Sequence, residues 1–364
     1  MQLPMKRLLT IIALLCVIVL SATAQELKWI DATKLGIHGY TKKTDKSPYY
    51  RYDHTPYEGL NNTVVGHSKK CTGLYLAFKT NSSQIAATWE NVPRRTADNM
   101  TGILQLGLDL YIKVDGEWRF AGVGRVSTSE QKYRRTRTIT KDMPEGEKEC
   151  LLYLPIWCEM REVLIGIDKG ATIEGLPSPF RHKVIVHGSS ITHGASASRA
   201  GLTYTAIMSR NLGIDFVNFG FSGECKMQPQ FLEFLKTCEC DAFLFDAFSN
   251  PNGQEIKERL KGFVEGLIKA HPGKPLIFLQ TPIDYDPWSG IEKAERRREK
   301  HEAARHIMKE LTKQHKDVYF LEVERATGKD GSVDTSHPND LGFHRFVEAY
   351  QPKIAKILKK YGIK

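Results

Sequence analysis

The chain has 364 residues, of which 52 are lysine or arginine and 42 are aspartate or glutamate, so its formal net charge is +10. A chain of this length has room for about two domains with buried cores. Its basic residues are spread along the chain, and the densest run is Arg296 to Arg298 with Lys300. This run lies in a glutamate-rich stretch that predicts a solvated helix face with i, i+4 ion pairs rather than a nucleic-acid groove.

Residues 1–24 have the pattern of a secretory signal peptide. Lys6 and Arg7 precede an apolar run from Leu8 to Leu20, and the small residues Ala22, Thr23 and Ala24 form a cleavage site. The apolar run is short for a membrane span, and no later segment approaches one. We therefore expect an exported protein, periplasmic or extracellular, without a transmembrane segment.

Six cysteines follow the signal peptide. An oxidising compartment permits disulfides, but a chain this long can bury a core without them. Six cysteines allow about fifteen complete pairings, so their connectivity stays open. The six are Cys71, Cys150, Cys158, Cys225, Cys238 and Cys240.

Residues 25–176 predict an all-β sandwich domain of the jelly-roll-like kind. Short alternating runs separated by turn residues are typical of sandwich strands, and they occur at Leu74–Thr80, Gln84–Trp89, Leu108–Val114 and Glu162–Asp168. The tryptophans Trp29, Trp89, Trp118 and Trp157 are interpreted as sandwich core, with stacking on sugar rings as the alternative.

The segment Leu176–Phe180, LPSPF, predicts the domain boundary, and residues 181–364 have a different rhythm. Apolar strand runs there alternate with helix-like stretches, including Tyr204–Leu212 and Gln254–Ala270. Such alternation predicts an α/β fold with a parallel sheet in a three-layer α/β/α arrangement.

Ser190 is a candidate nucleophile. It stands in HGSSITHG, His187–Gly194, directly after the apolar run Lys183–Val186, which predicts a buried strand that turns into a helix. Such a turn presents a hydroxyl beside free N–H groups, where a developing oxyanion is stabilised. Taken alone, a glycine followed by serines more often marks an ordinary turn.

The candidate partners of this serine lie near the end of the chain. DTSHPNDLG, Asp334–Gly342, places a carboxylate three residues before a histidine. A histidine that serves as general base needs an acceptor on its other ring nitrogen, and Asp334 is close enough to orient His337. Asp340 then predicts the cap of a C-terminal helix that starts at about Leu341.

Two further segments end at the same predicted sheet edge. Phe216–Phe221 predicts a strand followed by Gly223, whose backbone N–H can approach a ligand closely. Asp241–Ala247 predicts the next strand, and Asn250 follows it with an amide able to donate a hydrogen bond. Ligands bind at this edge in open α/β folds, although both segments are also ordinary turn chemistry.

Rival motifs fit less well. No Gly-x-Ser-x-Gly nucleophile elbow surrounds Ser190, because the residue two positions later is Thr192. Ser222 is a weaker alternative nucleophile. HEAARH, His301–His306, has its histidines five apart rather than four, so it does not predict a metal site and is interpreted as a solvated helix face.

The chain resembles the SGNH (GDSL-type) hydrolases, and in particular a two-domain subset with an N-terminal β-sandwich domain. The resemblance rests on GSSIT at Gly188–Thr192, SGE at Ser222–Glu224, Asn250-Pro251 and DTSHP at Asp334–Pro338. It departs from the family pattern where Ser189 replaces an aspartate and where Phe248 replaces a glycine. The resemblance implies Ser190 as nucleophile, His337 as base, Asp334 as its orienter, and an oxyanion hole of Ser190, Gly223 and Asn250.

We therefore expect an exported carboxylic ester hydrolase that works through an acyl-enzyme and needs no metal or organic cofactor. Its expected substrate is a small-molecule or glycan ester, with acetyl or other short acyl groups on carbohydrate. A lipid esterase or thioesterase of the same fold is the alternative within the enzymes. A non-catalytic glycan-binding protein on a hydrolase scaffold is the alternative outside them.

Overall fold

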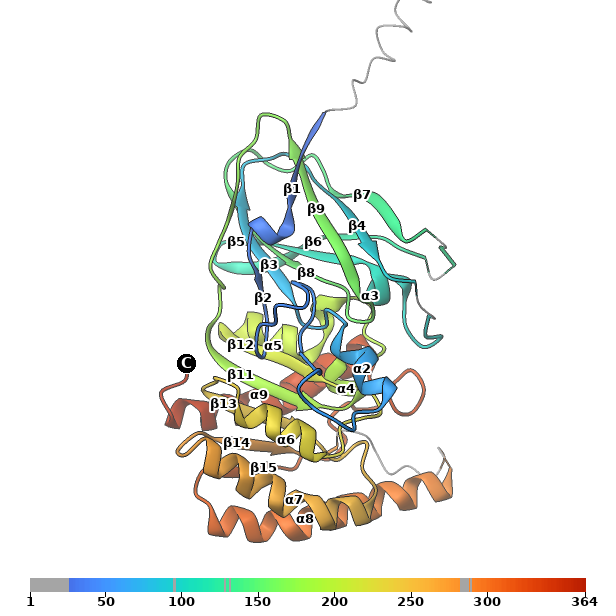
Figure 1. Cartoon of the computed structure of the whole chain (residues 1–364), viewed down its shortest axis with the longest axis vertical. Helices are drawn as coiled ribbons and strands as arrows, with labels where there is room; N and C mark the ends of the chain where they lie inside the picture. Colours follow the sequence, from blue (N-terminus) through green and yellow to red (C-terminus); the bar gives the residue numbers. More distant parts are fainter. Residues whose placement is uncertain (1–25, 94–95, 128, 131, 282–287, 289) are drawn as a thin grey trace, which may run out of the picture.

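The computed structural model describes residues 26–364 apart from 94–95, 128, 131, 282–287 and 289. The predicted signal peptide therefore lies outside the described residues. Two antiparallel sheets stacked on each other come first in the chain, and a parallel sheet flanked by helices follows (Figure 1). Both predicted architectures are confirmed.

The strands of the sandwich lie between residues 27 and 175. One sheet has the order β1–β9–β4–β7, and the other has the order β10–β3–β8–β5–β6, with β2 also paired to β3. Their bounds are β1 Leu27–Asp31, β2 Ile37–His38, β3 Tyr75–Thr80, β4 Ile85–Asn91, β5 Leu108–Val114, β6 Glu117–Gly124, β7 Arg134–Thr140, β8 Lys148–Tyr153, β9 Met160–Asp168 and β10 Ile173–Gly175.

The inner strands β3 and β8 of the second sandwich sheet are buried on both faces over most of their length. Leu76 of β3 and Leu152 of β8 pack in the core between the two sandwich sheets. Their neighbours Tyr75 and Tyr153 point the other way and pack into the core of the α/β part. Because successive strand residues face opposite sides, Tyr75–Phe78 of β3 and Cys150–Tyr153 of β8 are continuous apolar runs rather than alternating ones.

The second half of the chain forms a five-stranded sheet in the order β12–β11–β13–β14–β15. All four strand pairs are parallel, so the carboxyl ends of the strands share one edge. The strands are β11 Arg181–Gly188, β12 Ile214–Gly220, β13 Ala242–Asp246, β14 Leu276–Leu279 and β15 Val318–Leu321.

Helices cover both faces of this sheet, as Figure 1 shows. Val184 and Val186 of β11 share a core with residues of α5 and α9, whereas Ile185 shares a core with residues of α6, α7 and α8. The α-helices are α2 Asn62–Ser68, α3 Gly102–Leu106, α4 Ser190–His193, α5 Tyr204–Leu212, α6 Pro229–Lys236, α7 Gly253–Ala270, α8 Ile291–Gln314 and α9 Asp340–Lys360.

A buried ion pair joins the two halves of the chain. Arg199 donates to both carboxylate oxygens of Asp109 at 2.9 Å and to the Tyr111 hydroxyl at 2.6 Å. Asp109 also accepts the backbone N–H of Gly201 at 2.7 Å. These contacts connect β5 to the segment 196–203, so that segment is held against the sandwich.

Two details of the helices differ from the sequence interpretation. The cap of α9 is Asn339, whose side chain accepts from Gly342, because Asp340 lies within the helix and accepts the N–H of Ser198 instead. His301 is buried and bonded to Glu322 at 3.1 Å, so HEAARH is not a wholly solvated face.

The four tryptophans that were interpreted as sandwich core are not all buried. Trp89 is fully buried and donates to the carbonyl of Leu106, as a core residue should, but Trp29 is 39% exposed on the first strand. Trp118 and Trp157 are only partly buried.

The cysteines named above are all buried and unpaired in this structure. None of the helices in the described part of the chain is long and apolar enough to span a bilayer.

Candidate active site

The first turn after β11 places Ser190 at the edge of the parallel sheet. A β-carbon at Gly188 would lie 1.9 Å from the Thr192 hydroxyl, so only glycine permits this tight strand-to-helix turn. Ser189 then caps α4 by accepting the N–H of Ile191 at 3.1 Å. Ser190 is the first residue of α4 and is 9% exposed.

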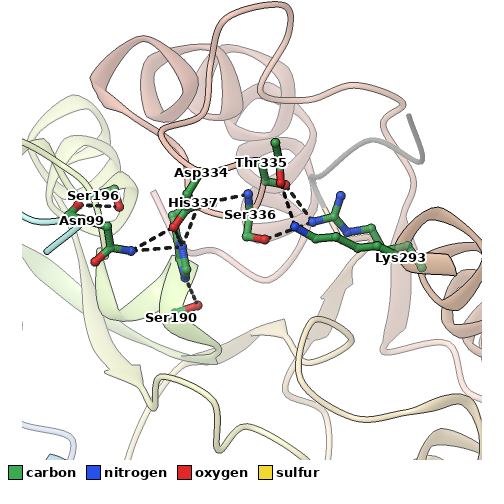
Figure 2. A network of polar contacts seen from close by, with 9 residues as sticks. Asn99, Ser190, Ser196, Lys293, Asp334, Thr335, Ser336 and His337 are labelled. Carbon is green, nitrogen blue, oxygen red and sulfur yellow. Dashed lines mark hydrogen bonds and ion pairs between the residues drawn. The ribbon is translucent and has the colours of Figure 1, made fainter. Parts of the chain in front are cut away.

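The loop before α9 brings the predicted partners to this serine. The distance between His337 Nε2 and Ser190 Oγ is 2.9 Å, and His337 Nδ1 lies 2.8 Å from Asp334 Oδ2. Both distances are those of hydrogen bonds. The structure therefore brings all three residues together across 147 residues of sequence, in the serine–histidine–carboxylate order that nucleophilic catalysis uses (Figure 2).

The carboxylate of Asp334 is surrounded by donors. Its Oδ1 accepts the backbone N–H groups of Ser336 at 3.1 Å and of His337 at 2.9 Å. Its Oδ2 accepts from Asn99 at 3.0 Å. Partial burial acts to raise the pKa of Asp334, but the hydrogen bonds from Asn99 and His337 outweigh it and lower this pKa to about 2. Asp334 is therefore an anion at neutral pH.

Two loops form the opposite side of the site. Gly223 follows β12 with a φ of 76°, a backbone conformation that favours glycine, and its residue lines the cavity in front of Ser190. The preceding residue, Ser222, is held through its backbone, because its N–H lies 3.4 Å from Nδ1 of His193 and its carbonyl lies 3.1 Å from Nε2 of His67.

Asn250 is oriented by a hydrogen bond of its own. Its side-chain oxygen accepts the backbone N–H of Cys225 at 3.1 Å, and the residue lines the cavity that contains Ser190. With the oxygen engaged, the amide nitrogen is left as the donor available to the cavity. This is the orientation that an oxyanion hole requires.

We predict that Asn250→Ala lowers kcat about a hundredfold or more and leaves KM nearly unchanged, because the lost donor acts on charge that exists only in the transition state. Steady-state kinetics and thermal unfolding of the same variant test this. If the melting temperature falls while kcat of the folded protein is normal, Asn250 only shapes the turn before Pro251.

The cavity in front of Ser190 has a volume of about 390 Å³, within the usual range for small-ligand sites. Two cationic residues of α8, Arg297 and Lys300, line it together with Phe248 and Thr281. Arg297 donates to the carbonyl of Thr335 at 2.7 Å, and Lys300 donates to the carbonyl of Ser249 at 2.9 Å. The basic run is thus more than a solvated face, although Arg296 does pair with Glu292 as expected.

Asp246 is a residue of the site that sequence reasoning missed. It ends β13, is fully buried, and accepts the Ser189 hydroxyl at 2.6 Å and the Thr192 and Ser249 hydroxyls at 3.2 Å and 3.1 Å. Burial raises the pKa of Asp246, against the effect of these hydroxyls. Through its bond to Ser189, Asp246 fixes the turn that carries Ser190, and through its bond to Ser249 it fixes the turn that carries Asn250.

The comparisons with known protein families agree with this geometry. Residues 181–355 match a family described as the GDSL-like lipase/acylhydrolase family. Residues 27–173 match a family, GxDLY, described as the N-terminus of SGNH-hydrolase-type esterases. The sequence GLDLY at residues 107–111 supplies Asp109 and Tyr111, the two partners of Arg199 across the domain boundary.

Solved structures with the same fold extend over both halves. A protein named as a GDSL-like lipase from Bacteroides ovatus is 38% identical, with a TM-score of 0.87 over 92% of this chain and 98% of that one. The salicylyl-acyltransferase SsfX3 from a tetracycline biosynthetic pathway is 20% identical, with a TM-score of 0.68 over 91% and 97%. A family two carbohydrate esterase from Cellvibrio japonicus is 12% identical, with a TM-score of 0.59 over 92% and 98%. The comparison with curated proteins gave no match.

Proposed function

Because the chain belongs to the GDSL-like lipase/acylhydrolase family, we propose that it is an exported serine ester hydrolase that removes acetyl or other short acyl groups from carbohydrate. The observation that carries this proposal is the unbroken line of contacts from Ser190 Oγ through His337 to Asp334, at 2.9 Å and 2.8 Å. A serine hydroxyl bonded to an oriented imidazole is an activated nucleophile.

The proposed reaction has two halves. Ser190 Oγ attacks the ester carbonyl carbon while His337 Nε2 takes the hydroxyl proton, and the negative oxygen of the tetrahedral intermediate receives hydrogen bonds from the Ser190 and Gly223 N–H groups and the Asn250 amide. His337 then gives its proton to the leaving alcohol, which leaves an acyl group on Ser190. Water attacks this ester while His337 takes its proton, and His337 then returns that proton to Ser190 Oγ as the carboxylic acid is released.

The size of the cavity supports a short acyl group. The acyl group and the alcohol must share a cavity of about 390 Å³. Phe248, which lines this cavity, is 2% exposed and packs beside Phe278. A likeness in fold to a carbohydrate esterase that also spans both halves of the chain adds to this. The protein named as a GDSL-like lipase from Bacteroides ovatus keeps a lipid esterase as the second candidate.

An acyl-chain series separates these candidates. We expect kcat/KM to be highest for the acetyl ester of 4-nitrophenol and to fall about tenfold or more by the octanoyl ester, because a fixed small pocket rejects added methylenes. We also expect the protein to release acetate from an acetylated polysaccharide. Preference for octanoyl esters or for an acyl thioester would favour the lipid esterase or thioesterase. A folded protein that turns over none of them would be a glycan-binding scaffold.

Export is part of this proposal, since a polysaccharide substrate lies outside the cytoplasm. We predict that the mature protein begins at Gln25, because Ala22-Thr23-Ala24 fits a cleavage site. N-terminal sequencing of protein from the periplasm or the medium tests this. Protein that stays in the cytoplasm with Met1 intact would contradict it.

A further inference from the structure

We propose that Asn99, a residue of the N-terminal sandwich, is a positioning residue of the active site that holds the Asp334 carboxylate in line with His337. This inference rests on the proposed triad. Figure 2 shows the Asn99 side chain pointing at this pair from the side opposite Lys293 of α8. Its amide nitrogen lies 3.0 Å from Asp334 Oδ2 and 3.4 Å from His337 Nδ1.

The chemistry of the three groups decides which of these contacts is the bond. A histidine whose Nε2 accepts the serine proton carries its own proton on Nδ1, and that proton points at Asp334. The Asn99 amide nitrogen is also a donor, so it cannot bond to Nδ1 but can bond to the carboxylate. Asp334 Oδ2 therefore has two donors, one from His337 and one from Asn99.

Asp334 needs such support because it lies near the surface. Its side chain is 36% exposed, and that of His337 is 22% exposed. Water can compete for an exposed carboxylate, and its rotation about the Cβ–Cγ bond would break the line to His337. The backbone N–H groups of Ser336 and His337 hold only Oδ1. Asn99 is the side chain, among the described contacts, that holds Oδ2 from outside the loop.

The loop that presents Asn99 is fixed on the sandwich side. Gln105, which is fully buried, accepts the N–H of Ala97 at 2.8 Å and donates to the carbonyls of Ala97 at 2.9 Å and Met100 at 2.8 Å. Met100 packs in the core that the two halves share. A buried amide that satisfies both ends of a short loop restricts its backbone.

The same loop is also fixed on the hydrolase side. The Ser196 hydroxyl donates to the carbonyl of Asn99 at 3.0 Å, and the Thr101 hydroxyl donates to the carbonyl of Ser198 at 2.6 Å. The segment 196–198 is itself tied to α9, because Asp340 accepts the N–H of Ser198 at 2.8 Å. The asparagine is thus preorganised from both domains, and the sandwich supplies a side chain to the site.

The charged groups near Asp334 and His337 come from α8 and α9. Lys293 of α8 donates to the Thr335 hydroxyl at 2.7 Å and Arg297 donates to the Thr335 carbonyl, while Asp340 at the start of α9 is occupied by Ser198. Replacing the neutral Asn99 by aspartate adds a second carboxylate beside the first. Two adjacent carboxylates favour a neighbouring imidazolium.

Two variants and a matched control test the proposal on a 4-nitrophenyl ester. Asn99→Ala is expected to lower kcat about tenfold with KM within about twofold, because orientation matters in the transition state. Asn99→Asp is expected to lower kcat at neutral pH more strongly and to move the acid limb of the kcat/KM profile about one pH unit higher. Asn81→Ala removes an asparagine that accepts the Thr172 N–H in the same domain, and it is expected to leave both quantities unchanged.

A double-mutant cycle identifies the route of the effect. Asn99→Ala in an Asp334→Ala background should cost less than about twofold, because the partner is already absent. An equal loss in both backgrounds, or an unmoved profile in Asn99→Asp, would overturn the proposal. If the wild-type protein hydrolyses no ester, the proposed function fails. NMR of labelled histidine tests the positioning role of Asn99 separately from activity. The His337 ring titration should move upward in Asn99→Asp, and an unchanged titration would overturn the proposal.

Discussion

Ser190→Ala is expected to lower kcat for an activated acetyl ester by about 10⁴-fold or more, because a triad serine cannot be replaced by another group at the same position. The described contacts of the Ser190 hydroxyl are limited to His337, and the capping hydroxyl belongs to Ser189. The variant should therefore fold as the wild type does. Initial rates together with thermal unfolding measure both expectations.

Ser222→Ala is the control for this experiment. Ser222 lines the same cavity, but its described bonds are made by its backbone to His67 and His193. We expect this variant to keep kcat within a few-fold of the wild type. If Ser190→Ala were active and Ser222→Ala inactive, the nucleophile would be assigned wrongly.

Asp334→Asn is expected to lower kcat by about 10³- to 10⁴-fold, as loss of the orienting carboxylate does in serine proteases. The local contacts explain the direction. The N–H groups of Ser336 and His337 both donate to Oδ1, so an asparagine would place its oxygen there and its amide nitrogen toward His337 Nδ1. The ring would then carry its proton on Nε2, where it cannot accept the proton of Ser190.

The melting temperature of this variant should change little, since the loop keeps its backbone bonds. Kinetics at saturating ester and differential scanning calorimetry separate the two effects. A loss of less than tenfold in kcat would mean that His337 is oriented by other groups and that Asp334 serves mainly to shape its loop.

The proximity of the candidate site residues was predictable because they stand at the ends of strands or in a short loop. Ser190, Gly223 and Asn250 each follow an apolar run, and the carboxyl ends of parallel strands share an edge. Asp334 and His337 are three residues apart, so one loop delivers both. Local pattern and sheet geometry predicted that these residues share one edge of the sheet, and the family resemblance implied their roles.

The supporting residues could not be found in this way. Asn99 lies 235 residues before Asp334 and reaches it only because the sandwich docks on the α/β part. Arg297 has the surroundings of an exposed helix charge in sequence, yet α8 directs it toward the cavity. Asp246 ends a buried strand without any motif around it. Their roles depend on tertiary packing, which a single sequence does not encode locally.

The errors have equally physical causes. Asn339 caps α9 in place of Asp340, because either residue type caps well and the Asp340 carboxylate is used by Ser198 instead. The sandwich strands do not alternate strictly, because Tyr75 and its neighbours on one sheet pack against the second domain. A strand covered on both faces loses the polar positions that mark its exposed side.

The central claim is that Ser190 becomes covalently acylated, and peptide-resolved mass spectrometry after reaction with a fluorophosphonate ester tests it most directly. Among the residues that the structure describes, four serines line the cavity, Ser190, Ser222, Ser249 and Ser336, so the position of the adduct is informative. We predict one adduct per chain, on the peptide that contains Ser190, and none in His337→Ala under the same conditions. An adduct on Ser222, Ser249 or Ser336, or no adduct on the folded wild-type protein, would contradict the account.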